Sequence, residues 1–114
     1  MQVHIDNQDE FLSFIIFGTK DELLDFAKRL QLKIAIEITG VNCRINLHPA
    51  KTSRLDNDNW SNNIYLSANA IEILASSIYN VFSGKISDTT HMHIDSGDLE
   101  FEGDLFDFII QLAK

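Results

Sequence analysis

The feature that most constrains this fold is the stretch FLSFIIFGTKDELLDFAKRL, in which an apolar strand runs directly into an amphipathic helix. Residues 11–18 carry apolar side chains on both faces, which is typical of an internal strand that is covered on both sides. Thr19 and Glu22 have the spacing of a capping box. Apolar residues then recur at helical spacing. We therefore predict a helix over residues 20–31 that docks on a sheet.

A second helix is predicted directly after Ser67, whose hydroxyl can cap its first turn. The residues that follow form one apolar stripe at helical spacing, namely Ile71, Leu74, Ala75, Ile78 and Phe82. Gly84 is expected to cap the C-terminal end. Ile73 and Val81 widen the stripe. This pattern predicts a helix that is deeply docked or one that also contacts a second subunit.

Elsewhere apolar and polar residues alternate, which predicts strands. Residues 34–38 and 43–47 each place their apolar side chains on one face. A four-residue loop between them would pair Ile38 with Cys43, with apolar side chains opposite one another and opposite charges across the other face. Cys43 is therefore predicted to be a core residue rather than a nucleophile.

The stretch HMHID, residues 91–95, predicts a strand that turns at Ser96 and Gly97 into a second strand. In that hairpin three polar pairs share one face: Asp95 with Asp98, His93 with Glu100, and His91 with Glu102. Two histidines on one strand face can also bind a metal, with carboxylates completing a nitrogen–oxygen ligand set for zinc. A solvated polar face, a partner-binding face and a metal site remain open interpretations. We assign no metal, no cofactor and no catalytic residue.

Together these elements predict an α+β fold in a single domain, residues 1–114. We expect a single mixed or antiparallel sheet of about six to seven strands, with two helices packed on one face. Residues 49–63 are predicted to form a long polar loop. Trp60 in this loop would either cover the domain or anchor a binding partner.

The charge of the chain is strongly negative, at -8, and it is unevenly distributed. Seven of the nine basic residues lie between Lys20 and Arg54, whereas residues 86–113 contain seven acids and no base. Such a surface repels nucleic acid and anionic lipid. No run of eighteen apolar residues predicts a membrane-spanning helix, and the N-terminus lacks the apolar region of a signal peptide. The single cysteine cannot form a disulfide within the chain, which is typical of a protein in the reducing cytoplasm. Together these features favour a cytoplasmic protein that binds neither nucleic acid nor membrane.

Three segments, FGTKDELLDFAKRL, SANAIEILASSIYNVF and HMHIDSGDLEFEGDLFDFIIQL, together resemble small bacterial immunity proteins of polymorphic-toxin and contact-dependent inhibition systems. The resemblance implies a cytoplasmic, non-enzymatic protein that binds and neutralises one cognate toxin. Such toxins are often basic nucleases. The acid-rich region independently favours a basic protein partner, because opposite potentials speed association.

The residues that we predict to contact such a partner are His91, His93, Asp95, Asp98, Glu100, Glu102, Asp104 and Trp60. One alternative is a small metal- or ligand-binding domain that uses the strand face of His91 and His93. Another is a dimeric structural or regulatory subunit. We expect a monomer, or a weak homodimer formed through the second helix.

Overall fold

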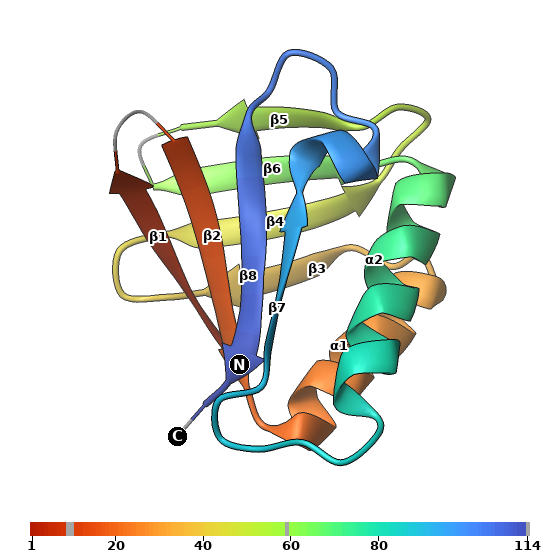
Figure 1. Cartoon of the computed structure of the whole chain (residues 1–114). Coiled ribbons are helices and arrows are strands. Elements are labelled where there is room, and N and C mark those ends of the chain that lie inside the picture. Colours follow the sequence, from red (N-terminus) through yellow and green to blue (C-terminus); the bar gives the residue numbers. More distant parts are fainter. Residues whose placement is uncertain (9–10, 59, 114) are drawn as a thin grey trace.

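The computed structural model describes residues 1–8, 11–58 and 60–113, which form two four-stranded sheets and two helices (Figure 1). Sheet A contains, in order across the sheet, β1 (Gln2–Gln8), β2 (Phe11–Gly18), β8 (Phe106–Leu112) and β7 (His91–Asp95). Sheet B contains β3 (Ile36–Thr39), β4 (Arg44–Pro49), β6 (Ser61–Leu66) and β5 (Arg54–Asn57). The helices are α1 (Lys20–Gln31) and α2 (Ala68–Phe82), and a short 3-10 turn, η1 (Ser96–Leu99), follows β7.

The two sheets share one topology. In each, an antiparallel hairpin comes first, and its second strand pairs in parallel with a strand that arrives later in the chain. That later strand has an antiparallel partner on its other side. The predicted α+β class is confirmed, but the prediction of a single sheet is wrong. Alternating patterns specify which face of a strand is apolar, and they leave open which strands join the same sheet.

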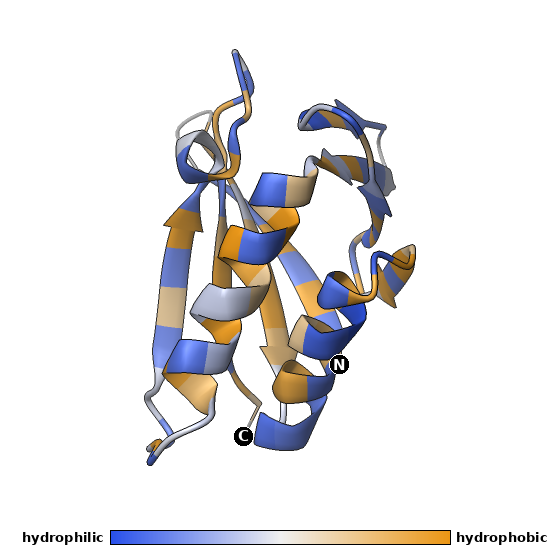
Figure 2. Ribbon diagram, turned by 90° about the vertical axis from the view of Figure 1, so that its right-hand side faces the viewer, coloured by the Kyte–Doolittle hydropathy of each residue, from blue (hydrophilic) through white to orange (hydrophobic). Residues whose placement is uncertain are grey.

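The inner faces of both sheets and the two helices enclose one core. The strands of the two sheets run in crossing directions in Figure 1. The helices lie side by side and close one side of the molecule between the sheets (Figure 2). Helix α2 contacts both β7 of sheet A and β6 of sheet B. The prediction that both helices pack on one face of one sheet is therefore wrong, because α2 bridges two sheets.

Both helices begin where the sequence predicts. Thr19 Oγ1 accepts a hydrogen bond from the Glu22 N–H (3.2 Å), and Glu22 Oε1 accepts one from the Thr19 N–H (3.0 Å), which completes the capping box. Ser67 Oγ accepts a hydrogen bond from the Ala70 N–H (3.1 Å), and every residue of the predicted stripe on α2 is buried. The predicted glycine cap of α2 is wrong, because the helix ends at Ser83 in a right-handed conformation.

The hairpin of β3 and β4 forms, but its register differs from the prediction by two residues. Ile38 lies opposite Ile45 rather than Cys43, and the Gly40 N–H donates to the Cys43 carbonyl (2.8 Å) within the loop. A two-residue shift leaves every side chain on its predicted face. Cys43 is fully buried, so its assignment to the core is confirmed, and burial raises the pKa of its thiol.

The loop of this hairpin joins the two sheets. Asn42 pairs with the backbone of Ile5 in β1: its Nδ2 donates to the Ile5 carbonyl (3.2 Å), and its Oδ1 accepts from the Ile5 N–H (3.3 Å). Gly40 lies directly against the Val3 carbonyl, where even a Cβ atom would overlap the backbone. The contact places the edge of sheet A against the end of sheet B.

Two further predictions need correction. Residues 49–63 are not one long loop, because β5 and the start of β6 form within them and pair antiparallel; Asn59 lies outside the described residues. Strand β2 is internal, as predicted, but it is not covered on both faces. Its outer side chains Ile15 and Phe17 are only half-buried, and Phe11 is exposed, because no described helix lies over that face of sheet A (Figure 1).

Candidate functional site

All five acids predicted to bind a partner lie on residues 95–104, which we call the acidic segment. It leaves β7, passes through η1 and returns to β8 at the upper end of the molecule in Figure 1. The strand predicted over residues 98–102 does not form. Strand β7 pairs instead with β8, so that Asp95 lies opposite Asp107. The predicted pairs of the hairpin, Asp95 with Asp98 and the two histidines with Glu100 and Glu102, are therefore wrong.

Buried groups hold the backbone of the acidic segment in place. Ser96 Oγ donates to the Asp104 carbonyl (2.7 Å) and accepts from the Phe106 N–H (3.2 Å), which bridges the two ends of the segment. Leu99 and Phe101 are buried in the core. The rings of Phe101 and Phe106 meet edge to face with centroids 4.7 Å apart. The segment is thus a pinned loop rather than a free one.

Acidic side chains alternate with these anchors. Asp98, Glu100 and Glu102 are exposed on either side of buried Leu99 and Phe101. Glu100 has a left-handed conformation, with φ 65°, which reverses the chain between the two anchors. The result is a set of carboxylates that project into solvent from a fixed backbone.

Two acids of the segment accept hydrogen bonds from distant parts of the chain. Glu100 Oε1 accepts a hydrogen bond from Ser67 Oγ (2.5 Å), which connects the segment to the cap of α2. Asp104 Oδ2 accepts one from the Leu55 N–H (3.2 Å) on the edge strand β5. By contrast, no hydrogen bond or ion pair among the described residues involves the side chains of Asp98 and Glu102. These two carboxylates are available to a partner.

An open depression of about 430 Å³ lies beside the segment. Its walls are formed by Lys51, Thr52, Ser53, Ser67, Glu100 and Glu102. Hydroxyl groups and carboxylates outnumber the single lysine, so the depression suits a polar or cationic side chain better than an apolar one.

The histidines of β7 lie on a different surface, the outer face of sheet A. His91 Nδ1 lies 3.0 Å from the Thr89 carbonyl. His93 Nε2 lies 3.4 Å from Asp95 Oδ1 and contacts Asp107 Oδ2 on the neighbouring strand. Asp107 was not among the predicted site residues. The sequence feature that could have identified Asp107 is its position as a single acid within the otherwise apolar run LFDFII.

Trp60 is far from the acidic segment. It precedes β6, and its side chain is 43% exposed. The acidic segment reaches Ser67, which follows the other end of that strand. The other contact of the segment with this sheet, from Asp104 to Leu55, lies opposite Ile64, which is four residues or about 13 Å along the chain from Trp60. Trp60 therefore belongs to a separate surface.

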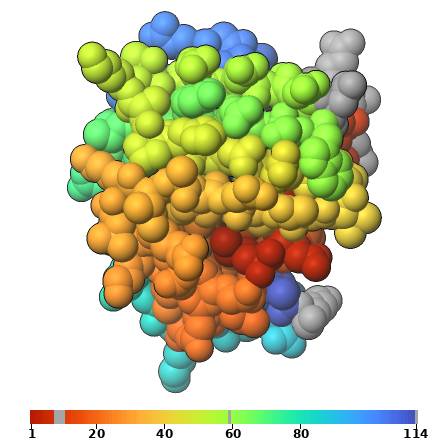
Figure 3. All heavy atoms as spheres, turned by 180° about the vertical axis from the view of Figure 1, so that it is seen from behind, coloured from red at the N-terminus to blue at the C-terminus, as the bar shows by residue number. Residues whose placement is uncertain are grey.

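The outer face of sheet B, seen from behind in Figure 3, is covered by the yellow and green atoms of β4, β5 and β6. Its polar groups are largely engaged with one another. The guanidinium of Arg54 lies 3.9 Å from the centre of the Tyr65 ring, which also stacks on His48. His48 Nε2 in turn lies 3.0 Å from Asn63 Oδ1.

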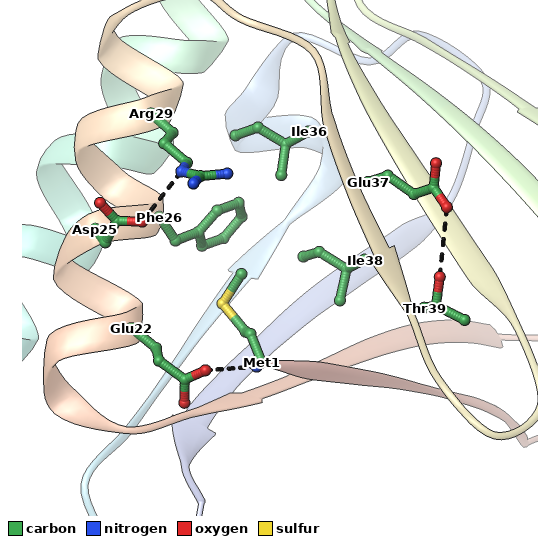
Figure 4. Close-up of a pocket in the computed structure, with 9 residues that line it drawn as sticks. All are labelled: Met1, Glu22, Asp25, Phe26, Arg29, Ile36, Glu37, Ile38 and Thr39. Carbon is green, nitrogen blue, oxygen red and sulfur yellow. Dashed lines mark hydrogen bonds and ion pairs between the residues drawn. The ribbon is translucent and has the colours of Figure 1, made fainter.

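A cleft of about 290 Å³ separates α1 from β3 (Figure 4). The charged groups that α1 contributes to it are already paired. The N-terminal amine of Met1 donates to Glu22 Oε2 (2.6 Å), and this hydrogen bond is the main reason why the pKa of Glu22 falls to about 2. Arg29 Nε lies 3.1 Å from Asp25 Oδ2. This cleft therefore offers a ligand fewer free charges than the acidic segment does.

Comparison of the chain with protein-family models, curated proteins and solved structures finds no match. Within the described residues, neither helix combines the length and apolar character needed to cross a membrane.

Proposed function

We propose that this chain is a non-enzymatic binding protein that captures a basic protein partner through the acidic segment. The observation that carries this proposal is the alternation of buried anchors with exposed acids, which fixes several carboxylates on one surface. A surface that is already ordered loses little conformational entropy on binding. The fixed arrangement of these carboxylates therefore favours a role in binding a partner over a role in solubility alone.

The electrostatics support a basic partner. The chain carries a net charge of -8, and residues 86–113 contain no lysine or arginine. Opposite potentials accelerate encounter with a basic protein by roughly 10-fold to 1,000-fold and reject acidic competitors. The free carboxylates of Asp98 and Glu102 would form the first contacts.

The partner that we propose is a toxin, which the chain would neutralise in the cytoplasm as an immunity protein. This identity rests on the resemblance of three segments to such proteins and on the acidic surface. The direct test is co-expression of the chain with the product of an adjacent toxin gene. Survival of the cells that make both proteins is the expected result, and killing at normal levels of the chain would refute the proposal.

The contact surface is tested with charge reversals that avoid structural groups. Glu100 is unsuitable because it accepts the hydrogen bond from Ser67 that connects the segment to α2. The double variant Asp98→Lys, Glu102→Lys should abolish protection. The matched control Asp21→Lys, Glu72→Lys changes the net charge equally on exposed helix positions and should protect as the unchanged chain does. Equal protection by both variants would exclude the acidic segment as the contact surface.

A further inference from the structure

Three potential metal ligands converge on the outer face of sheet A. His93 and Asp95 are two residues apart on β7, so their side chains point to the same side. Asp107 lies opposite Asp95 on β8. One ligand atom from each residue lies within 4.8 Å of the other two. Strand pairing therefore assembles one imidazole nitrogen and two carboxylate oxygens.

The burial of Asp107 is the second observation. Asp107 is only 3% exposed, although it lies on the outer face of the sheet. Its Oδ2 contacts His93, whereas its Oδ1 is buried with no hydrogen-bond partner among the described residues. Burying an ionised carboxylate without full compensation is costly. Among the described residues, no lysine or arginine forms an ion pair with Asp107, and the partner that its carboxylate has is His93.

The ligand types and spacing suit a divalent metal ion. Imidazole and carboxylate groups bind zinc at about 2.0–2.2 Å, and ligands in a tetrahedral arrangement then lie about 3.4 Å apart. His93 Nε2 and Asp95 Oδ1 are separated by 3.4 Å. His93 Nε2 and Asp107 Oδ2 are in direct contact, so these two atoms must move apart to admit an ion between them. The side chain of His93 is 55% exposed, so an ion can enter from solvent. Three protein ligands leave one position for water.

We propose that His93, Asp95 and Asp107 bind one divalent transition-metal ion, with zinc as the representative. The ion would neutralise the buried carboxylate of Asp107 and tie the edge strand β7 to the internal strand β8. His91 takes no part, because it is not among the described residues whose ligand atoms converge here. The site shares Asp95 with the acidic segment, but it does not use Asp98 and Glu102, the carboxylates that we propose for partner binding.

The test uses the full chain, purified without a histidine tag and stripped with a chelator, and then titrated with zinc chloride by calorimetry. One equivalent of zinc should bind with a dissociation constant in the micromolar range or below, and the thermal midpoint should rise with zinc concentration. His93→Gln and Asp95→Asn should each weaken binding at least 10-fold. Asp95 is exposed, so Asp95→Asn should not impair folding. His93→Gln removes the imidazole that contacts buried Asp107, so its folding is checked by circular dichroism before the titration.

His91→Gln is the matched control, because it removes a histidine two residues away on the same strand face. Its zinc affinity should equal that of the unchanged chain. Zinc affinity that is equal in His93→Gln and the unchanged chain would overturn the proposal, as would no binding at 100 µM zinc. The latter result would assign the cluster to a direct contact between His93 and Asp107 without a metal. Protection assays in the His93→Gln background separate this proposal from partner binding, which should persist without the metal.

Discussion

The contact between the β3–β4 loop and β1 predicts that Gly40→Ala will destabilise the chain severely. A Cβ atom at position 40 would lie 1.7 Å from the Val3 carbonyl oxygen and 2.8 Å from its carbonyl carbon. Both are backbone atoms, so no side chain can rotate away, and the loop must separate from β1. Overpacking of this kind costs about 1–3 kcal/mol. The separation also disrupts the two hydrogen bonds between Asn42 and Ile5, each contributing about 1 kcal/mol.

We therefore expect Gly40→Ala to lower the free energy of unfolding by about 3–5 kcal/mol, a large part of the 5–15 kcal/mol typical of a domain. Urea denaturation followed by circular dichroism measures this as a lower midpoint at an unchanged m value. Gly84→Ala is the control, because nothing lies within 4 Å of a Cβ atom at that position. It should change the free energy by less than about 0.5 kcal/mol. Equal midpoints for the two variants would refute the proposed junction between the sheets.

Three further predictions concern single side chains. Ser67→Ala removes the cap of α2 and should lower the free energy of unfolding by about 1–2 kcal/mol, as measured by urea denaturation. An unchanged midpoint would contradict the capping role. Because the folded chain lowers the pKa of Glu22 from 4.5 to about 2, the stability that Glu22 contributes is complete above pH 4.5 and lost as the pH falls through 2. Wild type should therefore be more stable than Glu22→Gln at pH 7 and equal to it below pH 2; a difference independent of pH would argue against this titration. Cys43 should react with a thiol reagent only after unfolding, because it is fully buried and burial raises the pKa of its thiol. Rapid labelling of the native chain would contradict this prediction.

Local features of this fold could be predicted because they depend on residues close together in the sequence. The capping box of Thr19 and Glu22 needs only three residues of separation, and the apolar stripe of α2 needs only helical spacing. Cys43 was assigned to the core for a similar reason, because its alternation with neighbouring apolar residues determines its face.

Strand pairing could not be predicted in the same way. The sequence HMHIDSGDLEF alternates polar and apolar residues through Phe101, as a hairpin would, yet the same alternation serves a pinned loop with Leu99 and Phe101 as anchors. The partner of β7 is β8, which begins eleven residues after β7 ends. Hydrogen bonds of Ser96 to the backbone at positions 104 and 106 bring the two strands together. No pattern within β7 encodes these contacts.

The candidate site was predicted in part for the same reason. The acids of residues 95–104 could be identified from composition. Which of them form hydrogen bonds within the chain could not, because the partners Ser67 and Leu55 are distant in sequence. Asp107 could have been found from one signal. A charged residue in an apolar run that forms an internal strand needs a partner on the neighbouring strand, and His93 supplies it.

The most direct test of the proposed function is the association rate of the chain with the proposed toxin partner, measured by stopped-flow fluorescence at low and physiological salt. For Asp98→Lys, Glu102→Lys we predict a rate constant at least 10-fold lower at low salt, with a smaller difference at physiological salt. The control Asp21→Lys, Glu72→Lys should retain most of the original rate. Equal rates for the two double variants would contradict recognition through the acidic segment.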